Sequence, residues 1–336
     1  MRFFSDNTAS VSPEILAALS EANVGREKAY GDDQWTQQLD AAFSRVFEKE
    51  VRAFIVATGT AANSLSLATL SPPYGSIYVH DKAHVVHDEC GATEFFTNGA
   101  RLVLVPGQGA KMTVEALRSA LNANPASVHT VQPVAISLTQ ATELGTVYQP
   151  AEITGLAQLA HERNLKVHMD GARFANALAT LNCKPADVTW RAGVDVLSFG
   201  ATKNGALTAE AVVFFDTSLV RDFEFRRKRG GQLLSKSRYT AVQLLAYLRN
   251  DLWLRNARRA NSLAARVGAA AGSRLLHPVE ANEIFVKLGD AGKERLRAQG
   301  FEFYDWGALG SGEARFVVSW DQPDDEVTQL CHALSA

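Results

Sequence analysis

Cysteine is scarce in this sequence, and the three that occur, Cys90, Cys183 and Cys331, are widely separated. An odd number at such spacing excludes a disulfide framework and offers no ligand set for a metal cage, so we interpret them as small buried residues. The sequence also lacks the run of about 20 apolar residues that crosses a bilayer. Its first residues lack the basic segment and apolar run typical of secretory signals. A cytoplasmic protein is therefore expected.

The sequence also lacks a large excess of either charge, because it has 34 lysines and arginines and 36 acidic residues, for a net charge of −2. A basic run at residues 226–229 places four charges on one predicted helix, which does not make a nucleic-acid footprint. Neither nucleic acid nor an anionic membrane is therefore expected as a partner. A Gly-x-Gly-x-x-Gly motif between an early strand and a helix is absent too, which leaves an NAD-dependent oxidoreductase as a distant alternative.

What the sequence does contain is enough apolar material for a large core, with 336 residues and 46% hydrophobic content. Chains of this size commonly divide into domains. We expect an N-terminal arm and helix over residues 1–24, a large domain over 25–245 and a small α+β domain over 246–336. The large domain should be α/β, with a mainly parallel sheet sandwiched by helices. One long helix over 239–271, rich in Ala, Leu and Arg and without proline, should link the two domains.

The stretch Val194–Gly205 holds the most informative pattern in the chain. Its first half is apolar and β-branched, which predicts a short buried strand, and its second half, Gly-Ala-Thr-Lys-Asn-Gly, cannot continue that strand. Lys203 therefore follows the C-terminal end of a core strand, where open α/β sheets bind their ligands. Apolar surroundings favour a neutral, nucleophilic amine there. The alternative is a solvated lysine at the sheet edge.

A second strand, within Leu165–Arg173, ends on Asp170 and is followed by small residues and Arg173. Neighbouring parallel strands would present Asp170 and Lys203 at one edge of the sheet. Pyridoxal phosphate needs this pair, because a lysine holds its aldehyde as a Schiff base and a carboxylate keeps its pyridine nitrogen protonated. The two motifs together therefore predict a pyridoxal-phosphate enzyme. Arg173, three residues after Asp170, is expected to bind a substrate carboxylate or the cofactor phosphate.

Small residues follow another predicted strand in Ala57-Thr58-Gly59-Thr60-Ala61-Ala62-Asn63, just before a helix. Small side chains let the backbone approach an anion, and N–H groups at a helix start point toward it. Since the lysine of a nucleotide P-loop is missing, the segment suits a monophosphate. An ordinary strand-to-helix turn capped by Thr58 or Thr60 is the alternative.

Two histidines, His84 and His87, follow the predicted strand at 76–80, and a helix is expected to start at Asp88-Glu89. A histidine in such a segment is more often a packing residue than a catalytic one. Metal ligation is open by residue type, but no full ligand set accompanies it, so no metal is expected.

Several motifs in the same order resemble the low-specificity L-threonine aldolases, in the fold-type-I pyridoxal-phosphate group of β-eliminating lyases. The segments that carry the resemblance are Phe4–Asn7, Tyr30–Asp33, Thr58–Asn63, Asp88–Ala92, Met169–Phe174 and Ser198–Gly205. It runs from Ser5 to about Phe316, nearly the whole chain.

The resemblance implies roles for residues that no pattern alone assigns. His84 would stack on the pyridine ring, with His87 and Glu89 in the same pocket. Some relatives carry a histidine near the substrate hydroxyl where this chain has Glu143, so that histidine's role is not transferred. Residues implied in substrate or cofactor binding are Ser5 and Arg315 at the substrate carboxylate, Tyr30 near the cofactor and a subunit interface, and Lys236 at the phosphate.

The expected reaction is the cleavage of a β-hydroxy-α-amino acid to glycine and an aldehyde, with Lys203, Asp170, His84 and His87 as catalytic residues. The base that removes the hydroxyl proton would be His84, His87 or a water that they hold. A homodimer or homotetramer with shared active sites is implied. Another pyridoxal-phosphate lyase, a racemase or a transaminase stays as the nearer alternative, because each could use Lys203 and Asp170.

Overall fold

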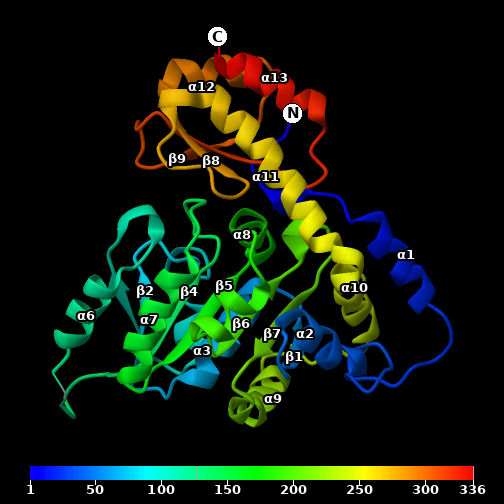
Figure 1. Ribbon diagram of the computed structural model, residues 1–336, viewed down its shortest axis with the longest axis vertical. Coiled ribbons are helices and arrows are strands. Elements are labelled where there is room, and N and C mark those ends of the chain that lie inside the picture. Colours follow the sequence, from blue (N-terminus) through cyan, green and yellow to red (C-terminus); the bar gives the residue numbers. More distant parts are fainter. Residues whose placement is uncertain (126, 336) are drawn as a thin grey trace.

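The computed structural model describes residues 1–125 and 127–335, and a seven-stranded sheet forms the centre of its larger part (Figure 1). The strands lie in the order β1-β7-β6-β5-β4-β2-β3. Strand β7 is antiparallel to both neighbours, and the pairs from β6 to β3 are parallel, so the predicted mainly parallel sheet is confirmed. The strands are β1 Arg52–Val56, β2 Gly75–His80, β3 Arg101–Val105, β4 Gln132–Thr139, β5 Lys166–Gly171, β6 Val196–Gly200 and β7 Glu210–Phe214.

Side chains from the two faces of this sheet enter two separate apolar cores, because successive residues of a strand point to opposite faces. On β6, Leu197 belongs to the first core and Val196 to the second. Helices that pack in the first core are α1 Pro13–Ala22, α2 Leu39–Phe47, α6 Val114–Asn122, α7 Pro150–Glu162, α8 Phe174–Leu181, α10 Arg238–Leu248 and the start of α11 Leu252–Ala271. The second core holds α3 Gly59–Leu70 and α9 Val220–Arg229, with the short helices α4 His84–His87 and α5 Ala92–Phe96 beside them.

A smaller part of the molecule is built on a three-stranded antiparallel sheet in the order β8-β10-β9. Its elements are α11 Leu252–Ala271, β8 Glu283–Lys287, α12 Gly289–Ala298, β9 Tyr304–Trp306, β10 Glu313–Val317 and α13 Asp324–Ser335. Phe3 is fully buried in this core, and its backbone bonds to Glu302 and Val317. The first residues of the chain therefore pack with the small domain, and the domain boundaries at 24/25 and 245/246 stay a prediction.

The expectation of one helix over 239–271 is wrong. Helix α10 ends at Leu248, and Asn250 and Asp251 adopt left-handed conformations with φ of 51° and 53°. Asn and Asp tolerate that conformation better than other side chains, so they can end one helix and turn the chain into the next. Helix α11 then runs from the large part of the molecule to the small one, as the yellow helix of Figure 1 shows.

Two further expectations are wrong, and a third finding concerns membrane-spanning segments. A helix start at Asp88-Glu89 is wrong, because α4 begins earlier, at His84, and α5 later, at Ala92. The expectation of buried cysteines is wrong too, since Cys90 is exposed and the other two are half-buried. Within residues 1–125 and 127–335, none of the helices combines the length and the apolar composition needed to cross a membrane.

Candidate active site

Asp170 and Lys203 line one cavity of about 370 Å³ at the C-terminal edge of the sheet. Strands β5 and β6 are parallel neighbours, with Asp170 paired in register with Ser198, and Lys203 lies in the loop that follows β6. The sequence prediction that these two motifs share a sheet edge is therefore confirmed. The same cavity is bordered by the start of α3 and by the loop after β4.

Glycine is required where the Lys203 loop crosses the Asp170 loop. A Cβ on Gly200 would lie 2.5 Å from the backbone oxygen of Ala172 and 2.8 Å from its Cα, closer than packed atoms come. Farther along, Asn204 donates hydrogen bonds to the Tyr247 hydroxyl at 2.6 Å and to the Trp253 carbonyl at 2.8 Å. These contacts fix the backbone on both sides of Lys203, so its amine is held beside the Asp170 motif.

Asp170 is the first member of a buried chain of hydrogen bonds that ends at His84. Asn63 of α3 donates to Asp170 Oδ2 and to Glu89 Oε1, at 2.8 Å in each case. Glu89 Oε1 also lies 2.9 Å from His84 Nδ1, which places the ring proton on that nitrogen. The backbone N–H of Ala172 donates to Asp170 Oδ1 at 3.0 Å. The His84 ring is thus oriented from behind by a carboxylate.

The electrostatics of this chain follow from burial and pairing. Burial raises the pKa of the Glu89 carboxyl, since removal from water disfavours its charged form, although His84 and Asn63 act against the shift. The hydrogen bond to Glu89 raises the pKa of the half-buried His84 above its ordinary value, although burial acts in the opposite sense. Asn63 was not predicted as a site residue, although its place one turn after Gly59 is a signal that helical spacing offers.

The N-terminus of α3 provides an anion-binding surface in the cavity wall. Thr58 caps the helix by accepting a hydrogen bond from the Ala61 N–H at 3.1 Å, and Gly59 and Thr60 line the cavity. A Cβ on Gly59 would meet no described atom within 4 Å, so the space over this turn is open. The first N–H groups of a helix have no intrahelical acceptor and favour an anion there. The turn is therefore a capped helix start that also leaves an open cradle for an anion.

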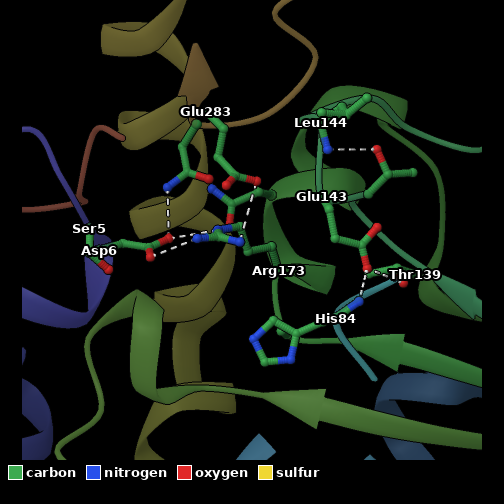
Figure 2. Close-up of polar contacts among 12 residues, drawn as sticks. Ser5, Asp6, His84, Thr139, Glu143, Leu144, Arg173 and Glu283 are labelled. Atoms are coloured by element: carbon green, nitrogen blue, oxygen red, sulfur yellow. Dashed lines mark hydrogen bonds and ion pairs between the residues drawn. The ribbon is translucent and has the colours of Figure 1, made fainter. Parts of the chain in front are cut away.

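Arg173 lines the cavity, but acidic side chains already bind its guanidinium (Figure 2). Its Nε and Nη2 donate to Asp6 Oδ2 and Oδ1 at 2.8 and 2.9 Å, and Nη1 lies 3.3 Å from Glu283 Oε2. Burial opposes the charge of Arg173, yet the two carboxylates outweigh it and raise its pKa. Burial acts on Asp6 too, but Arg173 and Lys203 lower the pKa of Asp6 to about 2.

Two cavity carboxyls were not predicted as site residues, Glu143 after β4 and Glu210 at the start of β7. Burial raises the pKa of Glu210 to about 7, and its Oε2 accepts a hydrogen bond from the Ala201 N–H at 3.2 Å. An acidic residue that opens an otherwise apolar strand is a signal that could have found it.

The remaining predicted residues lie outside the cavity in the described part of the chain. His87 is exposed, and its Nε2 lies 2.7 Å from the Asp81 carbonyl oxygen. The Ser5 hydroxyl accepts a hydrogen bond from the N–H of Asn7, which itself lines the cavity. Tyr30 is 53% exposed and Lys236 is exposed as well.

Arg315 is close to the Arg173 cluster without reaching the cavity wall. Its guanidinium packs over the rings of Tyr304 and Trp306, and its Nε lies 3.9 Å from Glu283 Oε1. The roles assigned to Arg315, His87, Ser5, Tyr30 and Lys236 stay predictions.

The polar groups of the cavity fit pyridoxal phosphate. The site combines an amine from Lys203, a carboxylate from Asp170 and a helix N-terminus with free N–H groups, which suit an aldehyde, a pyridinium nitrogen and a phosphate respectively. Within the described residues, no group of three or more His, Cys, Asp or Glu side chains is arranged to hold a metal ion. The arrangement can bind a small anionic cofactor and place its aldehyde beside Lys203.

The chain is similar to known proteins over most of its length. A family model described as Beta-eliminating lyase matches residues 2–291. A low specificity L-threonine aldolase of Pseudomonas aeruginosa is 45% identical over 333 residues, with 98% of this chain and 95% of that protein covered. One from a Pseudomonas sp. is 42% identical over 100% of this chain and 97% of its own length. The solved structure of Leishmania major threonine aldolase has a TM-score of 0.93 at 25% identity, covering 99% of this chain and 98% of that one.

Proposed function

Because the chain belongs to the beta-eliminating lyase family, with low-specificity L-threonine aldolases among its relatives, we propose that it is a pyridoxal-phosphate-dependent aldolase. It cleaves L-threonine, L-allo-threonine and related β-hydroxy-α-amino acids such as phenylserine to glycine and an aldehyde, reversibly. The observation that carries the proposal is the placement of Asp170 and Lys203 on neighbouring strand ends beside one cavity.

Each part of the cofactor has a contact in this proposal. Lys203 would hold the aldehyde carbon, Asp170 would bond to the ring nitrogen and His84 would cover the ring. The cradle at residues 58–60 would bind the phosphate through the α3 N–H groups. When bound, pyridoxal phosphate supplies an electron sink for the electron pair released at the substrate Cα.

The substrate carboxylate is bound by Arg173 and Arg315, with Ser5 and Tyr30 contributing. Arg173 is already oriented by Asp6, so it meets the carboxylate in a fixed position. Two points of attachment, the amine and the carboxylate, orient the Cα–Cβ bond for cleavage. The sequence indicates His84, or a water held by His84 and His87, as a candidate base for the hydroxyl proton, and the cavity adds Glu143 as another.

A homodimer or homotetramer with shared sites completes the proposal. Tyr30, with Lys228 above its ring, and Lys236 are exposed, so in an assembly they are free to meet the site of a second copy, where Lys236 would contact the phosphate. We place the protein in the cytoplasm, because all three of its cysteines are free thiols. Sedimentation velocity measures the assembly state directly.

The experiment that tests the function is product analysis on the purified holoenzyme, which should be yellow. With L-threonine as substrate, acetaldehyde and glycine should form in equal amounts. Ammonia, a 2-oxo acid or the D-amino acid as the main product would instead assign β-elimination, transamination or racemisation to the same cavity. A colourless protein that binds no pyridoxal phosphate would contradict the cofactor assignment.

A further inference from the structure

Glu143 places a carboxyl group in the wall of the cavity, in the loop that follows β4. One oxygen is fully engaged, since Oε1 accepts hydrogen bonds from the His84 backbone N–H and from the Thr139 hydroxyl, both at 2.8 Å (Figure 2). The other oxygen, Oε2, is buried and has no hydrogen-bond partner among the described residues. A buried polar atom without a partner is rare and calls for a ligand. Its natural partner is a hydroxyl group that enters the cavity.

Other ionisable groups around the cavity already have assignments. Lys203 and Asp170 serve the cofactor, and Arg173 is bound by Asp6. Glu89 accepts from Asn63 and His84, and Glu210 accepts from the backbone behind the Lys203 loop. Glu89 likewise has one bonded oxygen and one buried oxygen without a partner among the described residues, but its bonded oxygen orients the His84 ring, so Glu143 is the carboxyl left for the substrate.

The surroundings of Glu143 suit proton transfer near neutral pH. Burial raises the pKa of its carboxyl to about 7, although the bonds from Thr139 and the His84 N–H act against this shift. The titratable groups that face it are Asp170 from the end of β5 and Tyr148 beyond the same loop, and His84 contacts it through its backbone N–H. A carboxyl that titrates near the working pH can both accept and return a proton.

We propose that Glu143 is a further catalytic residue, which exchanges a proton with the β-hydroxyl oxygen of the substrate. The proposal rests on the cleavage reaction proposed above. Glu143 Oε2 takes the hydroxyl proton while the C=O bond of the aldehyde forms and the Cα–Cβ bond breaks. The electron pair of that bond stays with the glycine half, whose Cα then takes up one proton. Glu143 releases its proton to water, so the cleavage is proton-neutral, and in the addition direction the protonated carboxyl donates to the aldehyde oxygen.

The test compares two reactions of Glu143→Gln, which keeps the size of the side chain and removes its basicity. Cleavage of L-threonine should fall by about 10²–10⁴-fold, the usual effect of losing a general base. Exchange of the glycine Cα hydrogen in D₂O, followed by ¹H NMR, should stay within about threefold of wild type, because glycine has no β-hydroxyl. The absorbance of the bound cofactor and its dissociation constant should also be unchanged. Glu48→Gln, at an exposed carboxylate that does not line the cavity, is the matched control.

Two outcomes would overturn the assignment. Threonine cleavage by Glu143→Gln close to wild type removes the carboxyl from the reaction. Equal losses in cleavage and in glycine exchange make Glu143 a structural support of the His84 loop. A wild-type enzyme that exchanges the glycine hydrogen but releases no acetaldehyde would overturn the proposed function, and this inference with it, and would differ from both of those results.

The pH dependence of kcat/KM distinguishes a catalytic role of Glu143 from a structural one. In wild type, kcat/KM for threonine should fall as pH drops below about 7, since the base must be unprotonated. Thr139→Val removes a hydrogen bond that lowers the pKa of Glu143, so the acidic limb should move to higher pH. His84 keeps its Glu89 partner in that variant, so a limb due to His84 would stay in place, and an unmoved limb contradicts the proposal.

The pH dependence of the stability of the apoprotein gives a second test, which does not depend on activity. The pKa of Glu143 is higher in the folded state than in the unfolded one, so the folded protein binds the extra proton and loses stability as pH rises from about 4.5 to 7. Glu143→Gln should abolish that part of the loss. The difference between the urea midpoints of wild type and variant should therefore change between these two pH values, and a constant difference contradicts the burial on which the proposal depends.

Discussion

The Asp6 carboxylate and the Arg173 guanidinium form a buried two-point ion pair, with Nε–Oδ2 at 2.8 Å and Nη2–Oδ1 at 2.9 Å, between residues 167 positions apart. Asn282 of the small domain donates to the same carboxylate at 3.0 Å. Three residues before Asp6, Phe3 is buried in the small-domain core. This pair therefore fastens the N-terminal arm, the small domain and the cavity wall to one another.

Asp6→Asn should lower the stability of the protein at neutral pH and weaken threonine binding, because Arg173 loses its main partner. Removing one member of a buried ion pair costs about 3–5 kcal/mol of stability. Because Arg173 keeps its contact to Glu283, we expect a loss at the lower end of this range. Urea unfolding at pH 7 measures it, with Asp187→Asn, at a carboxylate whose side chain is 39% exposed, as control.

The same pair predicts an acid-sensitive contribution to stability. The pKa of Asp6 is lowered to about 2 from an ordinary 3.8, so its contribution is present above pH 3.8 and is lost as pH falls toward 2. The contribution is about 2 kcal/mol. The free-energy difference between wild type and Asp6→Asn should therefore narrow from pH 5 to pH 3, whereas a constant difference would show that Asp6 titrates normally.

Lys203 should be the residue to which the cofactor is attached. Borohydride reduction of the yellow holoenzyme, followed by peptide mapping, should find the cofactor on the peptide that bears Lys203. Lys203→Ala should lose all measurable turnover, while Lys184→Ala, at an exposed lysine paired with Glu48, should keep it. Label on another lysine would refute the assignment.

Asp170→Asn should separate cofactor binding from chemistry. An amide keeps the size of the side chain, but it can accept from only one of the two donors, Asn63 and Ala172, and it cannot stabilise a protonated ring nitrogen. We expect kcat for threonine to fall by about 10²-fold or more, while the dissociation constant of pyridoxal phosphate changes far less. A fluorescence titration and steady-state kinetics measure the two quantities, and an unchanged kcat would remove Asp170 from this role.

Local patterns predicted much of this molecule. Strand β6 at Val196–Gly200 and strand β5 at Lys166–Gly171 lie within the stretches where the sequence predicts them, because a run of apolar residues is a local signal. Asp170 and Lys203 could be found for the same reason, since each follows a strand whose apolar character is plain. The break at Asn250 and Asp251 was missed because an unbroken Ala/Leu/Arg composition outweighs two residues that merely tolerate a left-handed backbone.

What the sequence could not predict depends on contacts between distant segments. The segment around Arg173 contains no sign that its guanidinium is paired. Its partner Asp6 lies in the N-terminal arm, whose path is set by the burial of Phe3. Glu143 reads as a loop carboxylate, and its altered proton affinity arises only when that loop folds against His84 and Thr139. Neither pairing leaves a trace in local spacing.

Arg315→Ala tests whether this arginine reaches the substrate although it lies behind the cavity wall. A lost charge-assisted contact to a carboxylate is worth about 1–3 kcal/mol, so KM for threonine should rise about 5- to 150-fold. Glycine binding, followed by the cofactor absorbance, should weaken in parallel because both ligands share the carboxylate. If both affinities persist, Arg315 serves only the stack with Tyr304 and Trp306.

The two histidines should respond differently to alanine substitution. His84 lines the cavity and is oriented by Glu89, so His84→Ala should weaken pyridoxal phosphate binding as well as turnover, because the ring loses a packed aromatic face. His87 is exposed and bonded to the Asp81 carbonyl, so His87→Ala should keep the cofactor and change kcat less than tenfold, whereas loss of a general base costs about 10²–10⁴-fold. Cofactor titration and kcat on both variants decide between these roles. A fall of that size in His87→Ala, with the acidic limb of the pH profile lost, would make His87 the base and would overturn the assignment of Glu143.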